Sequence, residues 1–329
     1  MKKLLIYGAT GYTGRMAAEH ARQSALPLVL AGRSAKSLAP LAHRHGAEFR
    51  VFDVNDDKAI DEALTDIAVI LNCAGPFIRT AGPLIQAAIR NGVHYLDIAA
   101  ELDSYRLSQQ FDASAQAAGV MLLPGSGGSV AMLGCLASHA AARVTDPRKI
   151  SIALRVAGAM SRGSAISAKE SLTTETLVRI DDRLVALTVT DTRLFDFGNG
   201  SGPVPCFPVT LPDLITIGHT LAVPDIEAFV HVSGTAFPEG DLSALPDGPT
   251  DEHRAANRYQ AAVEVVGADG RIARSLLDTV NGYTFTAMAA AEAARRVLGG
   301  EARSGFQTPA GLFGSGFAGT IADTGIVDL

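Results

Sequence analysis

Three glycines within the first fourteen residues constrain the fold of this 329-residue chain more than any other feature. The segment GATGYTG (8–14) follows a short apolar run at 4–7 and precedes a helical pattern at 15–24. Glycines in a strand-to-helix turn permit a tight bend, a close approach of a pyrophosphate and close packing of the helix on the sheet. The position and the spacing therefore predict the first βαβ unit of a dinucleotide-binding domain.

Strand and helix patterns alternate from this turn to about residue 125. The expected strands are apolar throughout, which is typical of parallel strands covered on both faces. Strands are expected at 4–7, 28–31, 48–53, 68–72, 94–97 and 120–123, and helices at 15–24, 35–45, 56–64, 81–91 and 104–118. The alternation predicts an α/β fold in which residues 1–125 form a Rossmann-type, doubly wound parallel sheet.

Longer strands with few helices between them follow Pro124, which predicts a second domain over 126–329. Strands are expected at 150–156, 184–189, 226–232, 259–266 and 271–278, helices at 164–178 and 283–298, and loops at 199–212 and 238–249. The last two strands flank a hairpin turn at Ala268–Gly270. We expect an α+β domain with a mixed or antiparallel sheet, which supplies the substrate pocket and whose C-terminal helix and tail can return to the first domain. Few helices leave one sheet face uncovered, so we also expect a homodimer.

The residue after the second strand selects between the two nicotinamide dinucleotides. NAD-binding domains usually place an acid there to accept hydrogen bonds from the ribose, whereas this chain has Arg33 and Ser34. A guanidinium can pair with a 2′-phosphate, so NADP(H) is the predicted cofactor; a solvated arginine is the alternative. The other expected cofactor contacts are Gly8, Thr10, Gly11, Tyr12, Thr13 and Gly14 in the turn, Asp53 and Val54 near the adenine, and Asn72, Ala74, Gly75 and Pro76 after the fourth strand.

Four polar residues are candidates for chemistry in the small-molecule substrate site. Asp97 and Glu101 follow the fifth strand, where open α/β sheets bind their ligands, but either can instead cap the next helix. Ser126 lies in a glycine-rich loop, and its hydroxyl can bond a substrate or cap a helix. Arg162, between a strand and a helix, suits an anionic substrate group or is a plain surface arginine. Phe77 is expected to help line the same pocket.

Charge and cysteine content exclude several classes of function. A net charge of −6 gives no footprint for nucleic acid. The three cysteines (Cys73, Cys135 and Cys206) form no CxxC pair, so we expect neither a disulfide nor a metal site and place the protein in a reducing cytoplasm. The most apolar stretch, 119–142, is interrupted by Pro124 and His139 and is not expected to span a membrane.

Segments spread over nearly the whole chain resemble the saccharopine dehydrogenase-like oxidoreductases, a family that includes the trans-acting enoyl reductases. The matching segments are GATGYTGR (8–15), AGRS (31–34), NCAGPF (72–77), HYLDIAAE (94–101), LLPGSGGS (122–129), SRGSAISA (161–168) and TPAGLFG (308–314). The resemblance implies NADP(H)-dependent hydride transfer to or from a C=N, C=C or C=O bond of a small or acyl substrate. Ala100 replaces a glycine that this family commonly has, so catalytic residues are not transferred from it.

Two other classes share the glycine turn. Typical short-chain dehydrogenases need a Tyr-x-x-x-Lys pair for proton transfer, and no tyrosine of this chain has a lysine four residues later. A redox sensor of the NmrA-like kind needs only the cofactor motif and stays open as the alternative to an enzyme.

Overall fold

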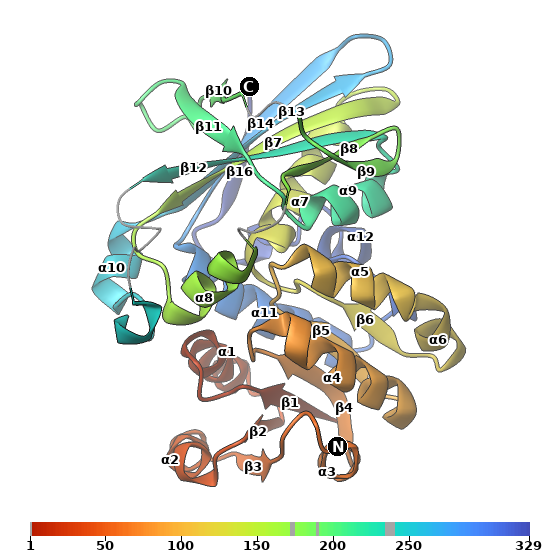
Figure 1. The fold of residues 1–329 in the computed structure, drawn as a ribbon, viewed down its shortest axis with the longest axis vertical. Helices are drawn as coiled ribbons and strands as arrows, with labels where there is room; N and C mark the ends of the chain where they lie inside the picture. The colour runs from red at the N-terminus through yellow and green to blue at the C-terminus, as the bar shows by residue number, and fades with distance from the viewer. Residues whose placement is uncertain (1, 172–174, 189–190, 234–240) are drawn as a thin grey trace. The chain divides into compact units, whose positions relative to one another are not determined.

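The computed structural model describes residues 2–171, 175–188, 191–233 and 241–329. Contacts between these residues divide the chain into two compact units. Unit 1 comprises Met1–Gly128 and Thr286–Gln307, and unit 2 comprises Ser129–Phe285 and Thr308–Leu329 (Figure 1).

Unit 1 is built on a seven-stranded sheet whose strands all run parallel. The strand order is β15-β6-β5-β4-β1-β2-β3. The bounds are β1 Lys3–Tyr7, β2 Leu28–Gly32, β3 Glu48–Val51, β4 Ile67–Asn72, β5 His94–Asp97, β6 Met121–Leu123 and β15 Gly305–Phe306. The order of the first six strands, 3-2-1-4-5-6, is that of the doubly wound dinucleotide-binding fold, which confirms the predicted fold class.

Helices connect consecutive strands of unit 1, and α1, α4 and α5 begin two to four residues earlier than the sequence pattern predicted. Their bounds are α1 Tyr12–Gln23, α2 Ala35–His45, α3 Asp57–Ala63, α4 Phe77–Asn91, α5 Leu102–Gln110 and α6 Asp112–Ala117. The single helix expected at 104–118 is two helices, which meet at Phe111 (Figure 1). Phe111 packs against the apolar core that Leu5, Val29 and Ile70 form in the sheet.

Unit 2 contains a mixed nine-stranded sheet. Its main path is β10-β11-β12-β7-β13-β14-β16, and β8 pairs with β12 and β9. The bounds are β7 Pro147–Ala157, β8 Leu177–Ile180, β9 Arg183–Ala186, β10 Arg193–Phe195, β11 Val204–Pro208, β12 Asp225–Ser233, β13 Tyr259–Gly267, β14 Ile272–Thr279 and β16 Gly325–Asp328. The β7–β12 pair is parallel, and β13 and β14 form the predicted antiparallel hairpin. The second domain therefore has the predicted mixed sheet.

More helices lie in this part of the chain than the two expected at 164–178 and 283–298. The helices are α7 Gly128–Ala141, α8 Arg162–Ser171, α9 Asp213–Leu221, α10 Asp251–Ala256, α11 Gly282–Leu298 and α12 Pro309–Phe313. α7 and most of α9 are buried on all sides, so their sequences lack the amphipathic period that identifies a surface helix.

Four expected segments differ from the structure or extend beyond the described residues. The helix expected at 164–178 ends at Ser171, and a strand follows from Leu177. The loop expected at 199–212 contains β11. The last residue of the strand expected at 184–189 and the first three of the loop expected at 238–249 lie outside the described residues. No helix in the described part of the chain is both long and apolar enough to cross a membrane.

Candidate functional site

The turn between β1 and α1 has room for glycine alone at two positions. Gly8 has φ +77°, and a Cβ atom there would lie 2.8 Å from the backbone nitrogen of Ala74. A Cβ atom on Gly14 would lie 2.3 Å from the carbonyl oxygen of Gly8. Cβ atoms in proteins do not approach other atoms to 2.3–2.8 Å. The first turn of α1 can therefore pack this close to β1 only if residues 8 and 14 are glycines.

The amino end of α1 is open to a ligand. Gly11 is its N-cap residue, and no side chain caps the helix. Arg15 donates a hydrogen bond to the Thr10 carbonyl oxygen (2.7 Å) and so holds the turn against the helix. Uncapped N–H groups and the positive end of the helix dipole make such an end a binding place for phosphate.

Arg33 and Ser34 follow β2 at the same edge of the sheet. Arg33 is exposed and forms no ion pair with the residues that the structure describes. The Ser34 side chain caps α2 by accepting a hydrogen bond from the Ser37 backbone N–H (3.3 Å). The Arg33 guanidinium is thus available for an anionic ligand, whereas the Ser34 hydroxyl already caps α2.

Asp53 and Val54 follow β3 at this edge. The Asp53 carboxylate accepts hydrogen bonds from the backbone and the side chain of Asn55, which lower the pKa of Asp53. Just before them, Phe52 stacks on Tyr7 with 4.7 Å between ring centroids. Burial raises the pKa of Tyr7 to about 12, so its hydroxyl stays neutral.

Asn72 organises the backbone after β4. The buried amide donates to the Thr80 hydroxyl (3.0 Å) and to the Tyr95 hydroxyl (3.2 Å), and its oxygen accepts the Ala74 backbone N–H (3.0 Å). Because Ala74 contacts Gly8, this amide sets the distance between the β4 turn and the glycine turn. Gly75 and Pro76 continue the same segment into α4, whose first residue, Phe77, is buried.

Asp97 is the centre of the hydrogen-bond network at the carboxyl ends of β5 and β6. Its carboxylate is fully buried and accepts from the Tyr95 hydroxyl (2.9 Å), the Ala99 N–H (3.0 Å) and the Gly125 N–H (2.8 Å). Burial raises the pKa of Asp97 to about 6, and the three donors limit the rise. The side chain therefore ties the loop after β5 to the loop after β6.

Ser126 joins the same network from the β6 side. The residue is fully buried, and both its hydroxyl and its backbone N–H donate to the Asp97 carbonyl oxygen at 2.8 Å. The structure thus brings two of the four predicted catalytic residues together. In this arrangement the side chains of Asp97 and Ser126 both form hydrogen bonds that hold together the loops after β5 and β6.

Glu101 and Arg162 are not part of this network. Glu101 is the N-cap residue of α5 but makes no side-chain cap; its carboxylate accepts the Ala100 backbone N–H (3.0 Å). Arg162 opens α8 in unit 2, where its guanidinium pairs with Asp247 and donates to the Leu245 carbonyl oxygen (3.2 Å). An anionic substrate at Arg162 would have to compete with Asp247.

Sequence reasoning missed Tyr95 and Thr80, the two hydroxyl groups that complete the network. Both are buried; Tyr95 donates to Asp97 on the same strand, and Thr80 of α4 accepts a hydrogen bond from Asn72 of β4. The sequence HYLD could have predicted the Tyr95–Asp97 pair. The two residues are two apart on one strand, so their side chains lie on the same face of the sheet.

The described residues contain no group of three or more His, Cys, Asp or Glu side chains that could hold a metal ion. Cys73, Cys135 and Cys206 are free thiols, and burial raises the pKa of Cys73. A thiol held neutral in this way is a poor nucleophile.

The first part of the chain matches a known family. Residues 4–123 match the family described as "Saccharopine dehydrogenase NADP binding domain". The match agrees with the predicted cofactor, NADP(H), and confirms the predicted resemblance for this part of the chain.

Curated relatives are similar over part of the chain. A saccharopine dehydrogenase-like oxidoreductase of Homo sapiens is 28% identical over 144 residues, which cover 38% of this chain and 34% of that protein. A trans-acting enoyl reductase of Mycobacterium leprae is 31% identical over 106 residues, 30% of this chain and 25% of that protein. The match thus spans between a quarter and about a third of the length of these curated relatives.

One solved structure resembles the whole chain. Saccharopine dehydrogenase (L-Glu forming) from Saccharomyces cerevisiae matches with a TM-score of 0.70 at 13% identity, over 100% of both chains. At this identity the likeness shows a shared fold.

Proposed function

Residues 4–123 form a saccharopine dehydrogenase NADP binding domain, and from that premise we propose that the protein is an NADP(H)-dependent oxidoreductase. The steric demand of the glycine turn supports the proposal, since Gly8 and Gly14 have no room for a Cβ atom and a phosphate-binding turn between strand and helix needs glycines at such positions. The open amino end of α1 would hold the pyrophosphate, and Arg33 would hold the 2′-phosphate. When bound, the cofactor supplies or accepts a hydride.

The chain's own residues would bind and orient the reactants. Asp97 and Ser126 hold the loops after β5 and β6 and so shape the nicotinamide end of the site. Glu101, at the start of α5, would orient the carboxamide or hold a proton near the substrate. We propose a pocket at the carboxyl ends of β4, β5 and β6, beside Phe77, Asp97, Glu101 and Ser126, in which a C=N, C=C or C=O bond of a small or acyl substrate is reduced or formed.

The cofactor choice is tested by titrating NADPH and NADH against the wild type and Arg33→Asp. A charge-assisted contact of about 1.5–3 kcal/mol predicts a ten- to hundredfold preference for NADPH, which the variant should abolish or invert. Arg44→Asp is the matched control. This exposed arginine lies at the other end of α2, about 16 Å away along the helix, and its loss should leave the preference unchanged. Equal wild-type affinities for both dinucleotides would contradict the role of Arg33.

Turnover separates the enzyme from a redox-sensing regulator. NADPH is mixed with an imine, an α,β-unsaturated thioester and a ketone, and the loss of reduced nicotinamide is followed. An oxidoreductase consumes NADPH with at least one class of acceptor. Tight, Arg33-dependent binding without turnover across the panel would favour the sensor.

We further propose that the protein works in a reducing cytoplasm as a homodimer. Free cysteines suit the compartment. Exposed apolar side chains on the strands of unit 2, Leu194, Phe207 and Val327, suit a second copy as partner. Sedimentation that shows a monomer at micromolar concentration would refute the dimer.

A further inference from the structure

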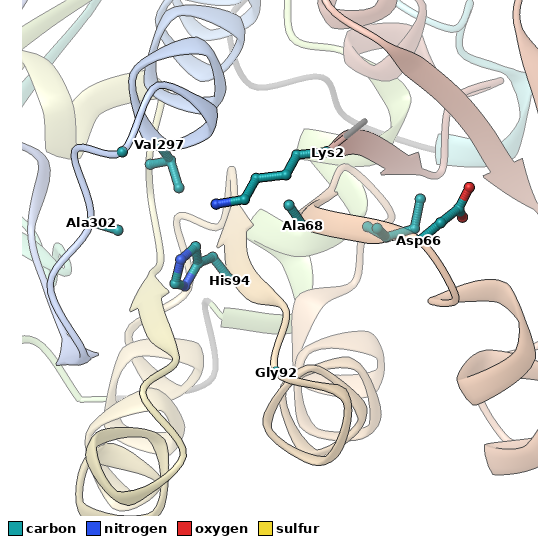
Figure 2. Close-up of a pocket in the computed structure, with 9 residues that line it drawn as sticks. Lys2, Asp66, Ala68, Gly92, His94, Val297 and Ala302 are labelled. Carbon is teal, nitrogen blue, oxygen red and sulfur yellow. The ribbon is translucent and has the colours of Figure 1, made fainter.

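A cavity of about 600 Å³ opens at the amino-terminal edge of the unit 1 sheet. It lies among the first residues of β4 and β5, the segment before β1 and the end of α11 (Figure 2). Lining residues include Lys2, Ala68, Gly92, His94, Val297 and Ala302. Its size is within the range of small-molecule sites.

This cavity is separate from the dinucleotide edge. His94 is the first residue of β5 and lines the cavity, whereas Asp97 is the last residue of β5 and belongs to the opposite edge. Three residue steps along a parallel strand span about 10 Å. A ligand bound beside His94 would therefore not displace a dinucleotide at the carboxyl ends of the strands.

Two hydrogen-bond donors face the cavity. Figure 2 shows the Lys2 side chain extending along it, with the ammonium group toward the His94 ring. Nδ1 of His94 accepts the Met121 backbone N–H (3.1 Å), so in the neutral ring Nε2 carries the hydrogen. Burial and the charge of Lys2 lower the pKa of His94, which keeps the ring neutral near pH 7.

The charges around the cavity leave one positive group uncompensated. Asp66 also lines it, but its carboxylate pairs with Lys3 (2.8 Å) and Arg50 (2.7 Å). Lys2 forms no ion pair with any residue that the structure describes. The remaining walls, among them Ala68, Val297 and Ala302, are apolar.

We propose that this cavity binds a small organic monocarboxylate. The carboxylate would accept hydrogen bonds from Lys2 Nζ and His94 Nε2, and a short apolar body would lie against Val297 and Ala302. A single ammonium and a single imidazole N–H match one carboxylate. A phosphate dianion would need more donors and would meet the nearby Asp66 carboxylate.

Calorimetric titration of hexanoate, benzoate and inorganic phosphate at constant ionic strength tests the site. We expect saturable binding of a carboxylate, one per chain, whose affinity is unchanged by saturating NADPH. Lys2→Gln should weaken it about tenfold because one charge-assisted hydrogen bond is lost. His94→Asn should weaken it severalfold, since asparagine can still accept the Met121 N–H but lacks the Nε2 donor.

Lys58→Gln is the matched control. This lysine is 87% exposed on α3, outside the cavity, and carries the same charge, so its loss should leave carboxylate binding unchanged. The proposal is overturned if neither carboxylate binds saturably, if phosphate binds more tightly than both, or if Lys2→Gln and Lys58→Gln have equal effects. These three outcomes are measured by carboxylate or phosphate binding alone, without turnover and without NADPH. A failure of the carboxylate site would therefore leave the proposed oxidoreductase function untouched.

Discussion

Asp213 begins α9 with a carboxyl group that is fully buried and whose two oxygens have no hydrogen-bond partner among the described residues. Burial raises the pKa of this group from 3.8 to about 7, against the smaller effect of its own backbone N–H. A buried acid of this kind is neutral when folded and ionised when unfolded near pH 6. The free energy of unfolding must therefore depend on its proton.

The sign follows from the raised pKa. Below about pH 4 both states hold the proton, and the contribution of Asp213 to stability is fully present. From there to pH 7 only the unfolded chain releases the proton, so the free energy of unfolding falls by about 1.4 kcal/mol per pH unit. Over the whole shift the loss is about 4 kcal/mol, and it levels off above pH 7.

Asp213→Asn replaces the titratable carboxyl group by an amide that has nearly the same shape as the neutral acid but no ionisable proton. Relative to the wild type, the variant should gain about 4 kcal/mol of unfolding free energy between pH 4 and pH 8. Urea unfolding followed by far-UV circular dichroism measures this, because the chain has no tryptophan to report by fluorescence. Other groups with shifted pKa values, such as Asp97, alter the free energy of unfolding of the wild type and of the variant equally. Their effects therefore cancel when the two free energies are subtracted.

Asp251→Asn is the matched control, an aspartate in the first turn of α10 that is 98% exposed. Its stability should keep the wild-type dependence on pH. If the curves of the wild type and of Asp213→Asn stay parallel from pH 4 to pH 8, the carboxyl group of Asp213 is not buried as an acid and the reasoning fails.

Two further predictions concern unit 1. Gly14→Ala places a Cβ atom 2.3 Å from the Gly8 oxygen, so it should cost about 1–3 kcal/mol in urea unfolding and weaken NADPH binding. Gly82→Ala, where the nearest atom is 3.6 Å away, should do neither. Tyr95→Phe takes a donor from Asp97 and an acceptor from Asn72, so it should cost about 1–3 kcal/mol, and an unchanged unfolding midpoint would show that the network is dispensable.

Six of the seven strands of unit 1 could be predicted, because the physical cause of most of them lies within a few residues of the chain, whereas the two-residue strand β15 was missed. Parallel strands buried on both faces are apolar over most of their length, as residues 4–7 and 67–71 are. Helix starts were predicted less well. α1 and α4 begin directly at the turns, at Tyr12 and Phe77, before any apolar period has repeated.

The missed helices have a different cause. α7 and α9 are buried almost completely, so their sequences carry no polar stripe to mark a helical period. Tertiary packing alone distinguishes such a segment from a buried strand. The same burial encloses Asp213, whose carboxyl group a sequence-based reading of the chain would place on a surface helix.

Side chains at the carboxyl ends of the unit 1 strands fall into two groups, which the sequence alone does not separate. Asp97 and Ser126 join loops that are far apart in the sequence, and Asn72 donates to the Tyr95 hydroxyl on the neighbouring strand, so only the folded chain brings these partners together. Arg33 instead is exposed at a strand end without a described ion-pair partner. Substitutions in the first group should therefore change folding and activity together, whereas substitution of Arg33 should change cofactor choice alone.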